Sequence, residues 1–162
     1  MKRGVLSYYL FMFKILAILL LISCTKLAFW TKSADKSPEE VVKGFLEFSA
    51  GAGALRDKRT IQDMCHGELK RIFERMSDEM FTMSYLSKAV TLKEVKVVST
   101  SIDNDVARVR YQVSVENKQG TDTTHETNER EVELTRIDGQ WRIDSIRPIG
   151  SDQIAFSRGM VF

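Results

Sequence analysis

The sequence predicts an α+β domain in which N-terminal helices pack on a curved, four-stranded antiparallel sheet. Between Val41 and Leu86 apolar residues recur at intervals of three and four, the spacing of helices that bury one face. From Val95 onward apolar and polar residues alternate, as they do in strands with one buried face. Helices followed by a run of strands indicate a helical layer against one side of an antiparallel sheet.

The first helix is expected to begin after Ser37. Ser37 at the N-cap, Pro38 at the first helical position and Glu40 at the third form a capping box. Apolar residues from Val41 to Phe48 then mark one buried face, and Gly51 is expected to end the helix.

A second, longer helix is predicted from Thr60 to Met76. Its apolar face holds Cys65, so this thiol is expected to be buried. Ser77 indicates a stop and a restart, which leads to a short third helix or apolar loop ending at Leu86. The apolar positions of the second helix are Ile61, Met64, Cys65, Leu69, Ile72, Phe73 and Met76.

Four strands are expected to follow as a meander. The first includes residues 95–98, the second covers 107–115 and the third runs from about 126 to 137. Asp138-Gly139 is a strong hairpin signal, and Trp141 faces inward on the fourth strand. The two other turns are expected at residues 102–105 and 117–120.

Charge and length exclude some classes of function. The chain has 162 residues and a formal net charge of +2. Residues 1–23 contain three basic residues and no acid, so the remainder carries −1. A near-neutral domain with interspersed charges lacks the clustered basic face of a nucleic-acid-binding protein. We therefore expect no nucleic-acid partner.

The N-terminal segment predicts export to a membrane. Nine uncharged residues, Ile15–Ser23, follow Lys14. This length suits the apolar region of a signal peptide better than a bilayer span of about 20 residues. An uncleaved, single-pass anchor remains an alternative, although its span would have to include Lys14 or Lys26. Translation from Met12 would give a more compact signal peptide.

The boundary of this segment resembles the lipobox of bacterial lipoproteins. Leu21, Ile22 and Ser23 precede Cys24 in the order typical of that family. The resemblance implies cleavage between Ser23 and Cys24, attachment of diacylglycerol to the Cys24 thiol, and a lipid-anchored tether over residues 24–36. No disulfide between the two cysteines is then possible.

The same resemblance implies a location in the bacterial cell envelope. The residues after the cysteine are Thr25 and Lys26, so the acidic residue that retains many lipoproteins at the inner membrane is absent. In a Gram-negative source we expect the periplasmic face of the outer membrane. In a Gram-positive source we expect the outer cell surface.

The element order and two short motifs resemble the nuclear transport factor 2-like (cystatin-like) superfamily. These motifs are the opening Ser-Pro-Glu-Glu-Val-Val at residues 37–42 and the closing Asp-Gly-Gln-Trp-Arg-Ile at residues 138–143. The likeness covers residues 37–149 and is greatest to small bacterial lipoproteins of unknown function. It implies a cone-shaped domain followed by a tail, residues 150–162, whose apolar end either plugs the cone or is recognised by a partner.

In this superfamily the cone between helices and sheet often holds a pocket. By this resemblance Tyr85, Tyr111 and Trp141 are candidates to line it, and Asp63 and His66 are weak candidates for an acid–base pair one helical turn apart. A purely structural role for Asp63, as an acid near a helix N-terminus, is the simpler interpretation.

No metal site or cofactor is expected. Cys65 and His66 would diverge on a helix, and His125 has no second histidine or cysteine at ligand spacing. We expect a non-enzymatic binding or scaffold domain with an envelope protein or a small hydrophobic ligand as partner. A small lyase or isomerase acting on a hydrophobic substrate in the cone is the alternative.

Overall fold

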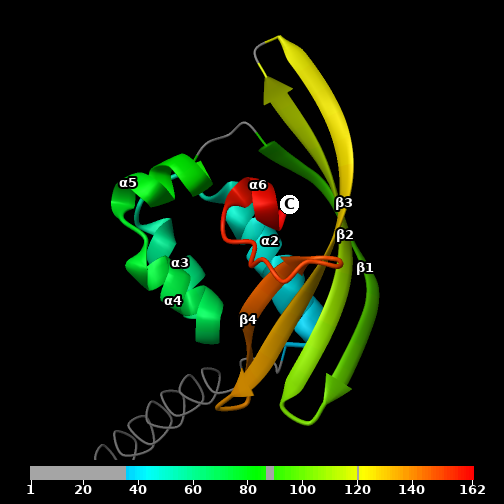
Figure 1. Ribbon diagram of the computed structural model, residues 1–162. Coiled ribbons are helices and arrows are strands. Elements are labelled where there is room, and N and C mark those ends of the chain that lie inside the picture. The colour runs from blue at the N-terminus through cyan, green and yellow to red at the C-terminus, as the bar shows by residue number, and fades with distance from the viewer. Residues whose placement is uncertain (1–35, 87–89, 120) are drawn as a thin grey trace, which may run out of the picture. The chain divides into compact units, whose positions relative to one another are not determined.

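The first helix of the domain is α2 (Pro38–Gly51). The computed structural model describes residues 36–86, 90–119 and 121–162. The predicted capping box is confirmed: the Glu40 amide donates to Ser37 Oγ at 3.3 Å, and the Ser37 amide donates to Glu40 Oε2 at 2.9 Å. Val42, Phe45 and Leu46 of α2 are buried. The helix lies beside the sheet (Figure 1) and contacts β1 and β2.

The predicted second helix is wrong in one respect, because it is two helices, α3 (Asp57–Met64) and α4 (Gly67–Arg75). Cys65 and His66 between them are extended rather than helical. The reason is a long-range contact: the His66 amide donates to the Ile143 carbonyl at 2.8 Å, and Cys65 forms a parallel bridge with the same residue. The chain therefore leaves the helix to pair with a strand.

Two short helical turns follow. Ser77 caps α5 (Asp78–Phe81) by accepting a hydrogen bond from the Met80 amide at 3.1 Å. A π-helical turn, η2 (Thr82–Leu86), continues directly from it. The stop and restart predicted at Ser77 is confirmed, and the following segment is helical rather than a loop.

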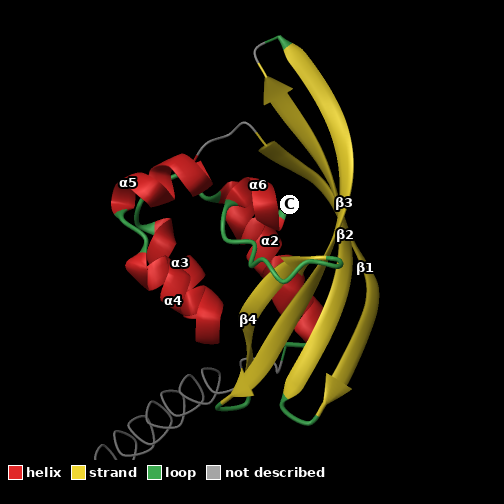
Figure 2. Cartoon of the chain, viewed as in Figure 1, coloured by secondary structure: helices red, strands yellow, loops and turns green. Residues whose placement is uncertain are grey.

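The sheet is a four-stranded antiparallel meander, coloured yellow in Figure 2, with the helices on one side of it. Its strand order follows the chain, so every connection is a hairpin. The strands are β1 (Val90–Asp103), β2 (Val106–Gln119), β3 (Asp122–Ile137) and β4 (Gln140–Pro148). The α+β architecture predicted from the sequence is confirmed.

The strands are longer than the alternation predicted. Residues 117–119, expected in a turn, continue β2 and pair with the start of β3. The hairpin at Asp138-Gly139 is confirmed, with φ of 50° and 79°. Positive φ at both central residues is the geometry of a type I′ turn, whose twist matches that of the flanking strands.

Alternation along the strands separates a buried face from a charged face. On the outer face Arg108 pairs with Glu133 at 3.1 Å, and Arg110 pairs with Glu131 at 2.9 Å. On the inner face the side chains of β2 pack under the helices and are at most 2% exposed. These inner residues are Ala107, Val109, Tyr111, Val113 and Val115.

The C-terminal residues pack into the same core. Ala155 donates from its amide to the Ile146 carbonyl of β4 at 2.7 Å. The short helix α6 (Arg158–Val161) follows, and both Val161 and Phe162 are fully buried. The segment expected as a tail thus closes the space between helices and sheet (Figure 1).

Candidate functional site

His66 lies in a hydrogen-bonded chain of three side chains at the junction of α3, α4 and the sheet. Its Nδ1 lies 2.8 Å from Asp144 Oδ1, and the Thr135 hydroxyl donates to Asp144 Oδ2. Such a carboxylate orients an imidazole, as in general acid–base sites. The predicted pair of Asp63 and His66 is wrong, since His66 is extended and its partner comes from β4.

Gly67 makes this arrangement possible. Its φ is +50°, and a Cβ at this position would overlap the Asp144 carboxylate. Glycine alone combines the left-handed backbone with such a close approach at low cost. The glycine at the start of α4 therefore lets the chain turn from the β4 edge into a helix while His66 keeps its carboxylate partner.

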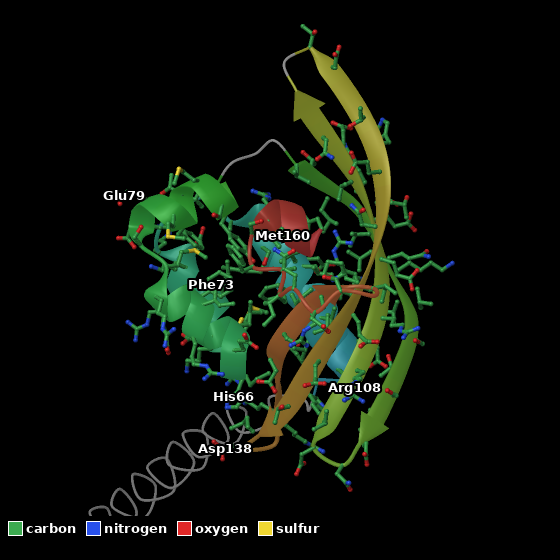
Figure 3. All side chains as sticks on the ribbon, viewed as in Figure 1. His66, Phe73, Glu79, Arg108, Asp138 and Met160 are labelled. Carbon is green, nitrogen blue, oxygen red and sulfur yellow. The ribbon has the colours of Figure 1, made fainter. Side chains whose placement is uncertain are left out.

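The His66 chain lies on the rim of the domain and not in its interior. The side chains of His66 and Asp144 are 47% and 20% exposed. Asp63 is also exposed, and its backbone carbonyl, not its carboxylate, accepts a hydrogen bond from Arg142. Figure 3 shows His66 at one end of α4, apart from Phe73, which points toward the sheet.

The space between helices and sheet is occupied by the domain's own aromatic side chains. Tyr85 stacks on Phe81 with ring centroids 5.3 Å apart, and Phe73 meets it edge-on, also at 5.3 Å. Both tyrosines predicted to line a pocket, Tyr85 and Tyr111, are fully buried. Trp141, the third candidate, is 8% exposed and lies 5.7 Å from the Arg136 guanidinium.

The buried titratable groups favour neutral forms. Burial raises the pKa of the Tyr85 and Tyr111 phenols and of the Cys65 thiol. The Tyr111 hydroxyl donates to the Val161 carbonyl at 2.8 Å, which gives it a structural partner. No carboxylate is among the buried residues of the described chain.

Arg158 is a buried cation that the sequence reasoning missed. It is 6% exposed; it donates to the Tyr85 carbonyl at 3.2 Å and also to the Ala50 carbonyl. These carbonyls belong to the last turns of η2 and α2, where the helix dipole favours a cation. Burial lowers the pKa of Arg158. The available signal was a single arginine within an apolar C-terminal segment.

Further buried polar atoms belong to Ser49, Tyr85 and Arg158. The Ser49 and Tyr85 hydroxyls interact with each other, whereas Arg158 Nε has no hydrogen-bond partner among the described residues. The polar groups of this region otherwise serve to fix the C-terminal segment: Arg130 Nε donates to the Met160 carbonyl at 2.8 Å. These hydrogen bonds therefore hold the C-terminal segment against α2, η2 and β3.

The described residues contain no group of three or more metal-ligating side chains that could hold an ion. His125 is exposed on β3. None of the helices in the described part of the chain is both long and apolar enough to cross a membrane. The lipobox residues Leu21, Ile22, Ser23 and Cys24, like the whole of the predicted signal peptide and most of the tether, lie outside the described residues.

The fold resembles several solved structures at low sequence identity. One is a SEC-C motif containing protein from Rhodopseudomonas palustris, with a TM-score of 0.54 and 17% identity over 78% of this chain and 88% of that one. Another is the intermembrane space region of the chloroplast protein ARC6, with a TM-score of 0.51 and 15% identity over 70% of this chain and 94% of that one.

A more distant match is an NTF2-like protein of unknown function from Shewanella oneidensis. Its TM-score is 0.44, with 15% identity over 68% of this chain and 97% of that one. No protein-family model matches the chain, and no curated protein matches it. At these identities the likeness concerns the fold, and no activity transfers with it.

Proposed function

We propose that the chain is a lipid-anchored protein of the bacterial cell envelope whose α+β domain binds a partner protein and is not an enzyme. The observation that supports a binding role best is the filled interior. Phe73, Phe81 and Tyr85 contact one another where a substrate pocket would have to open. A partner is then bound on the surface of the domain.

The rim chain of His66 and Asp144 does not change this proposal. An oriented imidazole is a competent base, but catalysis also needs a concave site that holds substrate and excludes water. Hollows of about 550, 470 and 390 Å3 on the described surface are lined by other residues. The pair has a structural use instead, because it holds the Cys65–His66 strap against β4.

The anchor is proposed from the lipobox. Leu21, Ile22 and Ser23 before Cys24 support lipid attachment, and the short apolar run before them supports cleavage. The proposed location is the periplasmic face of the outer membrane in a Gram-negative source and the outer surface in a Gram-positive one. The anchor would keep the domain within reach of envelope proteins.

Metabolic labelling with a fatty-acid probe tests the anchor. We expect the wild-type chain to incorporate label, Cys24→Ala to lose it, and the control Cys65→Ala to keep it, because Cys65 is buried in the domain. An unlabelled wild-type chain that stays in the membrane fraction would instead support the uncleaved helix. Equal label in wild type and Cys24→Ala would contradict the lipoprotein assignment.

A further inference from the structure

The two edges of the sheet differ in how they are covered. The edge of β4 receives backbone hydrogen bonds from the His66 amide to Ile143 and from the Ala155 amide to Ile146. Beyond its pairing with β2, β1 makes no backbone hydrogen bond to any other part of the described chain. A free strand edge offers unpaired amides and carbonyls to another strand.

The usable part of this edge is short and well defined. Register shifts interrupt β1 between Leu92 and Glu94 and again between Val97 and Ser99. Such bulges protect an edge by bending it, and they leave two regular stretches of four residues or more, Glu94–Val97 and Ser99–Asp103. Of these two, Glu94–Val97 alternates charged side chains with half-buried valines, so it is the stretch that suits pairing with another strand. Within this stretch Glu94 and Lys96 are exposed, and Val95 and Val97 are half-buried.

The charged side chains of this stretch are those of Glu94 and Lys96. Neither Glu94 nor Lys96 forms an ion pair with a described residue. Their neighbour Lys93, in contrast, pairs with Glu116 at 2.8 Å. Glu94 and Lys96 face the same side of the sheet because they lie opposite Ser114 and Gln112 of β2, two residues apart.

We propose that a second copy of this chain pairs with this edge, β1 against β1, to join two sheets across a twofold axis. Residues opposite each other in antiparallel strands share a face, so Val95 must oppose Val95 or Val97 of the second copy. With Val95 opposite Val97, Lys96 would face Lys96. With Val95 opposite Val95 on the twofold axis, Glu94 of each copy faces Lys96 of the other. These two opposite-charge pairs favour this register.

A hollow lies beside this edge of the sheet. It has a volume of about 470 Å3 and lies between α2 and β1. Leu92, Val95 and Ala50 supply its apolar lining. Its charged lining comes from Lys43 and Glu47 of α2, which are 3.9 Å apart, and from Lys93 and Glu94 of β1. In the selected register the second copy's Val95 points to the same side as this hollow.

The contact is self-limiting. In the selected register Glu94, Val95 and Lys96 pair regularly, whereas Val97 meets Lys93 at the bulge. A pairing of three residues is small for a stable interface. We therefore expect a reversible dimer rather than a permanent one, and the symmetric register closes at two copies. This inference does not depend on the proposed anchor.

Charge reversal tests the register. The full chain, solubilised in detergent, is studied by sedimentation equilibrium as wild type, Glu94→Lys, Lys96→Glu and the double reversal. We expect each single reversal to weaken the dimer by about tenfold or more, because it replaces two opposite-charge pairs with two like-charge pairs. The double reversal and a 1:1 mixture of the two single variants should restore it.

A matched control and a second measurement keep the test decisive. Glu126→Lys makes the same charge change at an exposed position of β3 and should leave the dimer intact. Val95→Cys, on the proposed axis, should form a disulfide-linked dimer under mild oxidation, whereas Glu126→Cys should not. A wild-type chain that is monomeric at all concentrations would overturn the proposal, and so would a dimer that Glu94→Lys does not weaken.

Discussion

Replacing Arg158 should destabilise the domain strongly for a residue so near the C-terminus. The Arg158 guanidinium donates to the Tyr85 carbonyl at 3.2 Å and to the Ala50 carbonyl, and it lies 5.9 Å from the Phe162 ring. In Arg158→Ala both carbonyls lose a charged donor. Because α2 has no basic residue in its own last turn, nothing nearby replaces this cation.

The magnitude follows from two opposing terms. Each hydrogen bond from a charged donor contributes about 1.5–3 kcal/mol, and the lost contact with Phe162 adds to this. Removing a cation that is 6% exposed also removes its desolvation cost, which offsets part of the loss. We expect the free energy of unfolding to fall by about 2–4 kcal/mol for Arg158→Ala.

Urea denaturation of the full chain, followed by far-ultraviolet circular dichroism, measures this change. Arg158→Lys is the matched variant: it keeps the charge but lacks the planar fork that reaches two carbonyls, so it should recover only part of the loss. If the free energy of unfolding fell by less than about 0.5 kcal/mol in Arg158→Ala, the guanidinium would not stabilise the two helix ends as proposed. Full recovery by lysine would show that charge alone matters.

Two further changes test other parts of the fold. Gly67→Ala should lower the free energy of unfolding by about 1–3 kcal/mol, because alanine is strained at a φ of +50° and its Cβ overlaps Asp144; an unchanged thermal midpoint would contradict this. The Asp57 carboxylate accepts from the Gly53 and Ala54 amides, and these bonds hold its pKa below the ordinary 3.8. The stability that the Asp57 carboxylate contributes is therefore present above pH 3.8 and is lost as the pH falls through the lowered pKa. The difference in free energy of unfolding between wild type and Asp57→Asn should shrink below pH 3.8. A difference that stays constant from pH 7 to pH 2 would argue against this.

Local signals predicted most of the architecture because they act over a few residues. The capping box at Ser37 and the Asp138-Gly139 turn depend only on neighbouring positions, and both are present as expected. The strict alternation from Ala107 to Val115 likewise identified the inner face of β2. Each of these features follows from spacing that is visible in the sequence.

The errors arise where distant contacts override local pattern. The helical spacing continues through Cys65, but the free edge of β4 draws Cys65 and His66 into backbone pairing with Ile143. Because His66 lies beside β4, its hydrogen-bond partner is Asp144 of that strand and not Asp63. Arg158 is buried against two helix ends that are more than 70 residues away along the chain. The spacing of residues around Arg158 therefore cannot predict its burial.

Titration with a small apolar probe shows whether the domain's own side chains fill its interior. Benzene is added to the wild-type full chain and to Phe73→Ala, and NMR shifts are followed for Tyr85 and Tyr111. Because Phe73 is fully buried, its removal should open a dry apolar cavity. We predict saturable shifts in Phe73→Ala and none in the wild type. Saturable binding of benzene beside Tyr85 and Tyr111 in the wild-type chain would show that the interior is open to ligands.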